Sequence, residues 1–155
     1  MADLKTFGIN KGEGKVHEEI VYSLALIYNM VDNRITNYLK DYDLTIGKLN
    51  ILIAIKHQGG EKGIRQVQVS EHLIVTPSNM TKLIDKLEKE GLVTRSDLEG
   101  DRRVNIVKIT KKGSNLLDSI WEGYNAQLKE QINCLSKDKQ KQLAGLLTEW
   151  FERIQ

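Results

Sequence analysis

The segment from Val69 to Gly113 constrains the fold of this 155-residue chain more than any other part of it. A short helix is predicted over Val69 to Leu73, and after a turn a second helix begins with Thr76 as its N-cap and Pro77 in its first turn. The apolar stripe that this second helix turns inward is predicted to comprise Met80, Leu83, Ile84 and Leu87. Two β-prone runs follow, Leu92 to Ser96 and Val104 to Ile109, joined by a polar turn. Helix, turn, helix and hairpin in this order predict a winged helix-turn-helix, in which the second helix fits into the DNA major groove.

The charged residues are distributed unevenly along the chain. The net charge is only +2, but residues 76–113 contain nine Lys or Arg and six Asp or Glu, an excess of three positive charges. The rest of the chain contains fourteen basic and fifteen acidic residues. Because contact with phosphates requires a local positive surface, this distribution favours nucleic acid as the partner of the segment.

Long amphipathic helices are predicted on both sides of the segment, since apolar residues recur there every three or four positions. They cover 15–40, 110–133 and the residues after Ser136, which is the predicted N-cap of the last helix. The first of them carries a second apolar stripe on another face, as expected for a helix between its own domain and a partner subunit. Another helix is predicted from Ile46 to about His57 with Thr45 as its N-cap, and a short strand is predicted over Ile64 to Gln66.

The predicted fold class is therefore mainly α (α+β), a winged helix-turn-helix with long terminal helices that form a dimerisation lobe. Residues 1–15 are predicted to be a flexible arm. Residues 16–42 and 111–155 are assigned to the helical dimerisation region, and residues 43–110 to the DNA-binding region.

Three runs within the segment resemble the MarR (multiple antibiotic resistance regulator) family of winged-helix transcription factors. They are Ser70-Glu71-His72-Leu73, the helix from Thr76 to Glu88, and Gly91-Leu92-Val93-Thr94-Arg95. Asp101-x-Arg103, followed by Ile109-Thr110, is similar to the wing signature of that family. The resemblance implies an obligate homodimer whose DNA affinity is often tuned by a small molecule or an oxidant, and repression is the commoner behaviour.

Candidate DNA contacts lie in the second helix and in the hairpin, because the first turns of a helix in the major groove face the base edges. They are Thr76, Pro77, Ser78, Asn79, Thr81 and Lys82, followed by Arg95, Asp101, Arg102 and Arg103. Arg103 is predicted to enter the minor groove with Asp101 holding it in position, and Arg95 and Arg102 to contact phosphates. Two alternatives remain: Ser78 and Thr81 merely solvate a helix surface, and Asp101 and Arg103 form a surface ion pair that contributes at most about 1 kcal/mol.

A pocket for a small aromatic or phenolic effector is predicted between the first helix, the second helix and the start of the long late helix. Tyr28, Tyr38 and Trp121 are its candidate lining residues, although aromatic side chains at such positions also serve as ordinary core.

No cofactor and no metal site are expected. His17, His57 and His72 lie in different segments at no ligand spacing. The single cysteine, Cys134, allows no internal disulfide and is consistent with a reducing cytoplasm. The family's peroxide sensors usually carry a cysteine in the first helix, where this chain has none. No apolar run approaches the roughly 20 residues that a membrane span needs.

An enzyme is disfavoured, because His17-Glu18-Glu19 lacks the second histidine of a zinc-protease helix and has Val21 in its place. The remaining alternative is a winged-helix module that binds proteins without reading DNA. Steep salt dependence of binding to duplex DNA would separate the two.

Overall fold

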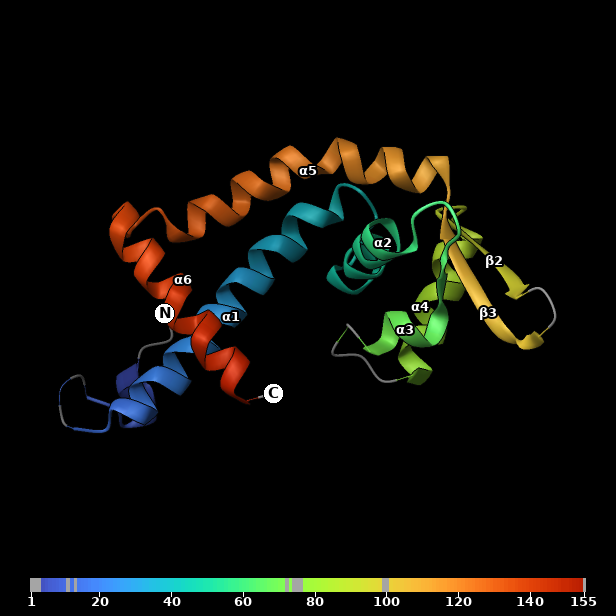
Figure 1. Ribbon diagram of the computed structural model, residues 1–155. Helices are drawn as coiled ribbons and strands as arrows, with labels where there is room; N and C mark the ends of the chain where they lie inside the picture. The colour runs from blue at the N-terminus through green and yellow to red at the C-terminus, as the bar shows by residue number, and fades with distance from the viewer. Residues whose placement is uncertain are drawn as a thin grey trace. The chain divides into compact units, whose positions relative to one another are not determined.

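A computed structural model describes residues 4–154 except 11, 13, 72, 74–76, 99 and 100, and the side chains of 77, 78, 98 and 101–103 also lie outside the description. Figure 1 shows the elements, which in chain order are η1 (Leu4–Phe7), α1 (Val16–Lys40), α2 (Ile46–Gly59), β1 (Ile64–Arg65), α3 (Gln66–Glu71), α4 (Pro77–Lys89), β2 (Val93–Leu98), β3 (Asp101–Ile109), α5 (Lys111–Ile132) and α6 (Lys137–Ile154).

The chain forms two compact units. One comprises Met1–Ile35 and Gly123–Gln155 and is called the helical lobe below; the other, Thr36–Glu122, is called the winged lobe. These boundaries fall inside α1 and α5, so each of these two helices contributes residues to both units.

The sheet of the winged lobe is small and antiparallel, with the strand order β1-β3-β2. Ile64 of β1 pairs with Val107 of β3, and Val93 of β2 pairs with Ile109. The β2–β3 hairpin, drawn in yellow and orange in Figure 1, has an irregularity between Asp97 and Leu98. The predicted short strand is present as β1, and it pairs with β3 of the predicted hairpin.

Helix α2 is the centre of the winged lobe. Thr45 caps it as predicted, accepting a hydrogen bond from the backbone N–H of Lys48 at 3.3 Å. Buried apolar residues occur on several of its faces: Leu49, Ile51, Leu52, Ala54 and Ile55. A helix that is apolar on several sides is surrounded by other elements, and α2 therefore supports the rest of the lobe.

Helix α3 differs from its prediction, since it begins at Gln66 and ends at Glu71 and does not extend from Val69 to Leu73. The predicted strand at residues 64–66 is correspondingly shorter. The side-chain oxygen of Gln68 accepts a hydrogen bond from the backbone N–H of Arg65 at 3.3 Å. This is the return half of a capping box, which sets the start of the helix three residues earlier than the apolar pattern suggests.

The transition from α4 to β2 is a tight turn built around Gly91. The φ of Gly91 is 70°, in the left-handed region. The N–H of Gly91 donates to the carbonyl of Glu88 at 2.9 Å, and the N–H of Leu92 donates to the carbonyl of Leu87 at 2.9 Å. Together the two bonds define a Schellman motif. In the first turn of α5, a Cβ on Gly113 would lie 2.2 Å from the carbonyl oxygen of Leu92, so only glycine permits this approach.

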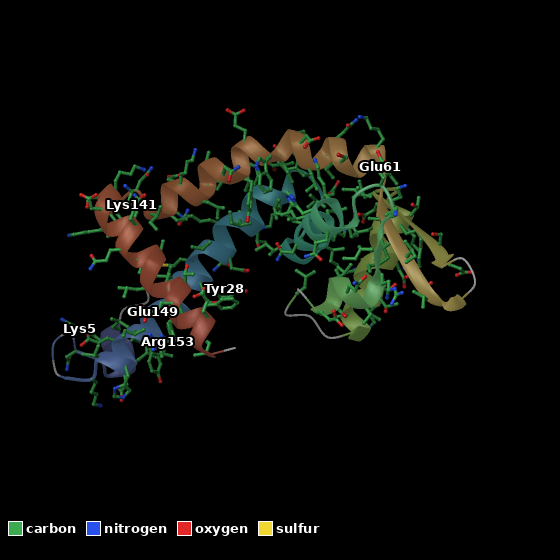
Figure 2. All side chains as sticks on the ribbon, in the orientation of Figure 1. Lys5, Tyr28, Glu61, Lys141, Glu149 and Arg153 are labelled. Atoms are coloured by element: carbon green, nitrogen blue, oxygen red, sulfur yellow. The ribbon has the colours of Figure 1, made fainter. Side chains whose placement is uncertain are left out.

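The helical lobe contains few buried residues. Helix α6 is capped by Ser136, as predicted, yet none of its described residues is buried. Figure 2 shows Glu149 and Arg153 on α6, where their side chains form an ion pair at 2.8 Å. Where the sequence predicts a flexible arm, Leu4–Phe7 forms a 3-10 helix and Phe7 contacts the ring of Tyr22, with centroids 5.4 Å apart. None of the described helices has an apolar stretch long enough to cross a membrane.

Candidate nucleic-acid interface

Helix α4 has one buried face and one polar face. Met80, Ile84 and Leu87 are buried, whereas Asn79, Thr81 and Lys82 are exposed. A period of 3.6 residues places Lys82 opposite the buried set, with Asn79 and Thr81 on the two flanks of the helix. Three predicted contact residues therefore lie on the accessible surface of the first two turns.

Helix α4 begins at Pro77, so this residue lies in the first turn, as predicted. The backbone of Ser78 continues the helix, but the side chains of Pro77 and Ser78 lie outside the described part of the structure. Thr76, the predicted N-cap, lies outside the described residues altogether, and its capping and DNA contact stay predictions.

A side chain that sequence reasoning missed restrains the polar face of α4. The amide Nε2 of Gln66, at the start of α3, donates to the hydroxyl oxygen of Thr81 at 3.1 Å. The bond links the two helices of the helix-turn-helix at a candidate DNA contact. In the sequence, the only indication of this bond is that the amide of Gln66 can donate a hydrogen bond. The amide does not indicate which residue accepts it, so Thr81 could not be predicted as the partner.

The hairpin supplies the second part of the interface. Asp101, Arg102 and Arg103 are the first residues of β3, and Asp101 pairs with Leu98 across the strands. Their backbone therefore lies at the tip of the hairpin, where the sequence places it. Their side chains are outside the described part of the structure, so the Asp101–Arg103 pairing and the groove contacts stay predictions.

Arg95 lies in β2 and is held by carboxylates of α4. Its Nη2 is 2.5 Å from Oδ1 of Asp85 and 3.7 Å from Oε2 of Glu88, and its side chain is 21% exposed. The arginine thus connects the hairpin to the recognition helix, a role that the sequence did not indicate. Contact with phosphate by Arg95 stays a prediction. Asp85 and Glu88 are three residues apart, which brings them to one side of a helix.

The three aromatic residues predicted to line a pocket have different surroundings. Trp121 lines a cavity of about 210 Å³ in the winged lobe, together with Ile53, Lys56, His57, Leu117 and Asp118. Tyr38 instead donates its hydroxyl hydrogen to the carbonyl of Ile120 at 2.9 Å. Tyr28, labelled in Figure 2, belongs to the helical lobe and is 65% exposed.

Groups of side chains that could hold a metal ion are absent from the part of the chain that the structure describes. Cys134 is exposed and unbonded. The candidate interface comprises the polar face of α4, the hairpin, and the contacts that connect them.

An antiparallel three-stranded sheet packed against α2, α3 and α4, with a polar helix face beside a projecting hairpin, defines a winged helix-turn-helix. Comparison with known proteins agrees. Residues 44–104 match the model of the MarR family. The transcriptional regulator MhqR of Bacillus subtilis (strain 168) is 25% identical over 131 residues, covering 84% of this chain and 86% of MhqR.

Solved structures share the fold. A MarR-like transcription regulator from Bacillus cereus ATCC 10987 superposes with a TM-score of 0.81 at 22% identity, covering 92% of this chain and all of the other. MepR of S. aureus, solved in complex with DNA, gives a TM-score of 0.77 at 19% identity over 86% of this chain and 96% of MepR. This chain is a transcriptional regulator of the MarR family.

Proposed function

We propose that two copies of this chain bind one double-stranded operator and repress transcription from it. The exposed polar face of α4, held on a buried core beside the β2–β3 hairpin, is the observation that carries the proposal. The positive charge of residues 76–113 is the local excess that phosphate contact requires. The structural neighbour MepR was solved with DNA, which supports duplex DNA as the ligand of this fold. An operator ligand would place the protein in the cytoplasm.

The second copy is proposed from the surface of the helical lobe. Two apolar grooves open on this lobe, one of about 540 Å³ and one of about 490 Å³. The larger is lined mainly by Ile27, Met30, Val31, Leu128, Leu135 and Leu143, and the smaller by Ile20, Val21, Leu146, Leu147 and Trp150 among others. The lobe also exposes large apolar side chains beside these grooves, and apolar surface of this kind commonly marks a protein interface, so a second copy is its expected cover.

Two-fold symmetry of such a pair has a consequence for the DNA. Each α4 reads one half-site, and the operator is then a pseudo-palindrome whose half-sites lie about one helical turn apart. Within each half-site, Asn79 suits adenine and Lys82 suits guanine or a phosphate, while Arg103 enters the minor groove.

Selection of bound duplexes from a random pool tests the function directly. The expected product is a two-fold symmetric sequence, and its affinity should fall steeply with salt because bound phosphates release counterions. Recovery of unrelated sequences, or binding that does not respond to salt, would favour the alternative of a protein-interaction module.

An effector site is proposed at the cavity beside Trp121. The indole of Trp121 is 42% exposed and lines the cavity, and Lys56 and His57 add polar groups to the lining. Lys56 is paired with Asp118 at 2.5 Å, and an aromatic anion would compete with that carboxylate. A panel of small phenols and aromatic carboxylates should contain a compound that raises the melting temperature of the protein but not of Trp121→Ala. A panel without such a compound would count against the site.

A further inference from the structure

Lys48 of α2 is the one charged residue that is buried in the described part of the chain, with 8% of its surface exposed. Its Nζ lies 2.5 Å from Oε1 of Glu90 and 3.4 Å from the backbone carbonyl oxygen of Asp43. Removing an ammonium group from water costs several kcal/mol unless a partner compensates for it. The central helix of the winged lobe therefore directs its buried charge at the residue that follows the recognition helix.

The same end of α4 is held from a second side. The carbonyl of Glu90 accepts a hydrogen bond from Nζ of Lys112 at 2.8 Å. The hydroxyl oxygen of Thr110 lies 2.8 Å from the carbonyl oxygen of Gly91 and 3.1 Å from that of Leu92. Carbonyl groups at the end of a helix lack helical partners and carry partial negative charge, so cations and donors bind there. The exit of α4 is thus clamped between α2 and the start of α5.

The other end of α4 carries the exposed residues Asn79, Thr81 and Lys82. Helix α4 has 13 residues, and at 1.5 Å per residue the distance from its exit to its first turn is about 18 Å. A tilt of about 5° at the exit would therefore displace the first turn by roughly 1.5 Å. A displacement of this size breaks hydrogen bonds to base edges, whose lengths vary by only a few tenths of an ångström.

We infer that Lys48 is a positioning residue for DNA reading: its ion pair with Glu90 sets the angle of α4 and thereby the selectivity for base sequence, although Lys48 contacts no base. The inference rests on the proposed function. An ion pair with one buried partner adds little net stability compared with apolar residues of the same volume, but it defines one geometry. Loss of the pair should therefore reduce discrimination between sequences more than it reduces stability.

Lys48→Met tests the inference in the full-length protein, because methionine fills most of the same space without the charge. Its affinity for the selected duplex should fall about tenfold at fixed salt, with affinity for a scrambled duplex changed less than twofold. The slope of affinity against salt should stay as in the wild type, since Lys48 neutralises no phosphate. A slope reduced by about one phosphate would overturn the positioning role and make Lys48 a phosphate contact.

Lys40→Met is the matched control. Lys40 is exposed on α1 and donates to the side chain of Asn37 in its own helix at 2.8 Å, so this change removes the same charge without touching α4. Discrimination should equal that of the wild type. An equal loss in both variants would mean that net charge, and not the geometry of α4, sets the selectivity.

Glu90→Gln extends the test to the other partner, whose side chain is 39% exposed and tolerates a neutral amide. It should lower discrimination in the same direction, and it decides the matter if Lys48→Met does not fold. Exchange of the charges in Lys48→Glu with Glu90→Lys should restore discrimination at least in part. If the variants discriminate between the selected and the scrambled duplex as well as the wild type does, the positioning role of Lys48 is overturned and the proposed function stands. If the wild type itself does not discriminate between the two duplexes, the proposed function is overturned as well.

Discussion

The two lobes use their apolar residues in opposite ways. Among the described residues, seventeen of the nineteen buried apolar residues belong to the winged lobe, and fifteen of the seventeen large exposed ones belong to the helical lobe. The winged lobe therefore surrounds its own core. The helical lobe leaves its apolar surface uncovered in the single chain, so under the proposed function its stability would depend on assembly. The proposal thus assigns DNA reading and assembly to parts of the molecule with different sources of stability.

The largest effect is expected from Trp150→Glu, which places a charge on the apolar face of α6. The pair should dissociate, and operator affinity should fall at least about a hundredfold because each half-site then binds alone. Sedimentation and gel-shift titration measure the two quantities. Lys141→Glu, on the same helix, should change neither. A dimer of Trp150→Glu at micromolar concentration would contradict the division of tasks between the lobes.

Gly113→Ala should have the next largest effect, and it addresses the tight packing of the winged lobe. The added methyl group would lie 2.2 Å from the carbonyl oxygen of Leu92, and stability should fall by about 3 kcal/mol although alanine is the better helix former. Gly145→Ala in α6 meets no atom within 4 Å in the single chain and should instead add up to about 1 kcal/mol. Denaturant unfolding measures both; effects of the same sign would contradict the comparison.

Arg103→Ala should affect DNA binding while sparing assembly. Loss of an arginine from the minor groove is expected to weaken operator binding at least tenfold, or about 1.4 kcal/mol, with the dimer intact. Arg34→Ala removes the same charge from the helical lobe and should leave affinity within twofold. Unchanged affinity of Arg103→Ala in a titration at fixed salt would remove the groove contact from the proposal.

The smallest effect is expected from Thr45→Ala, which removes the N-cap of α2. The backbone N–H of Lys48 would lose its acceptor, and stability should fall by about 1 kcal/mol. The urea midpoint should shift without a change in slope. Thr45→Ser retains the hydroxyl and should keep most of the stability; a loss as large as that of alanine would show that packing of the methyl group, and not capping, is responsible.

Most helices of the fold could be predicted because their signals are local. Thr45, Pro77 and Ser136 mark the starts of α2, α4 and α6, and the apolar period of α4 correctly placed Met80, Ile84 and Leu87 inside. The exposed side of α4 followed from the same period. A cap or a period involves neighbours along the chain, so it can be read without knowing the fold.

The connections between elements could not be predicted. Lys48 and Glu90 are 42 residues apart in the sequence, and nothing in either local pattern indicates that they meet. In the sequence, Arg95 cannot be distinguished from any other cation in a hairpin. Its ion pair with Asp85 forms only because β2 packs on α4. The order of the sheet, with β1 beside β3, depends in the same way on contacts between distant segments.

Helix α6 has no buried residue along its described length, and the assembly proposed to cover it would make operator occupancy depend on the amount of chain. If the operator takes only the assembled pair, its occupancy at low protein concentration rises with the square of the amount of chain, so halving that amount lowers occupancy about fourfold. The number of chains in the cell would then act as an input to the switch, alongside any effector, and small changes in synthesis or degradation would be amplified at the promoter.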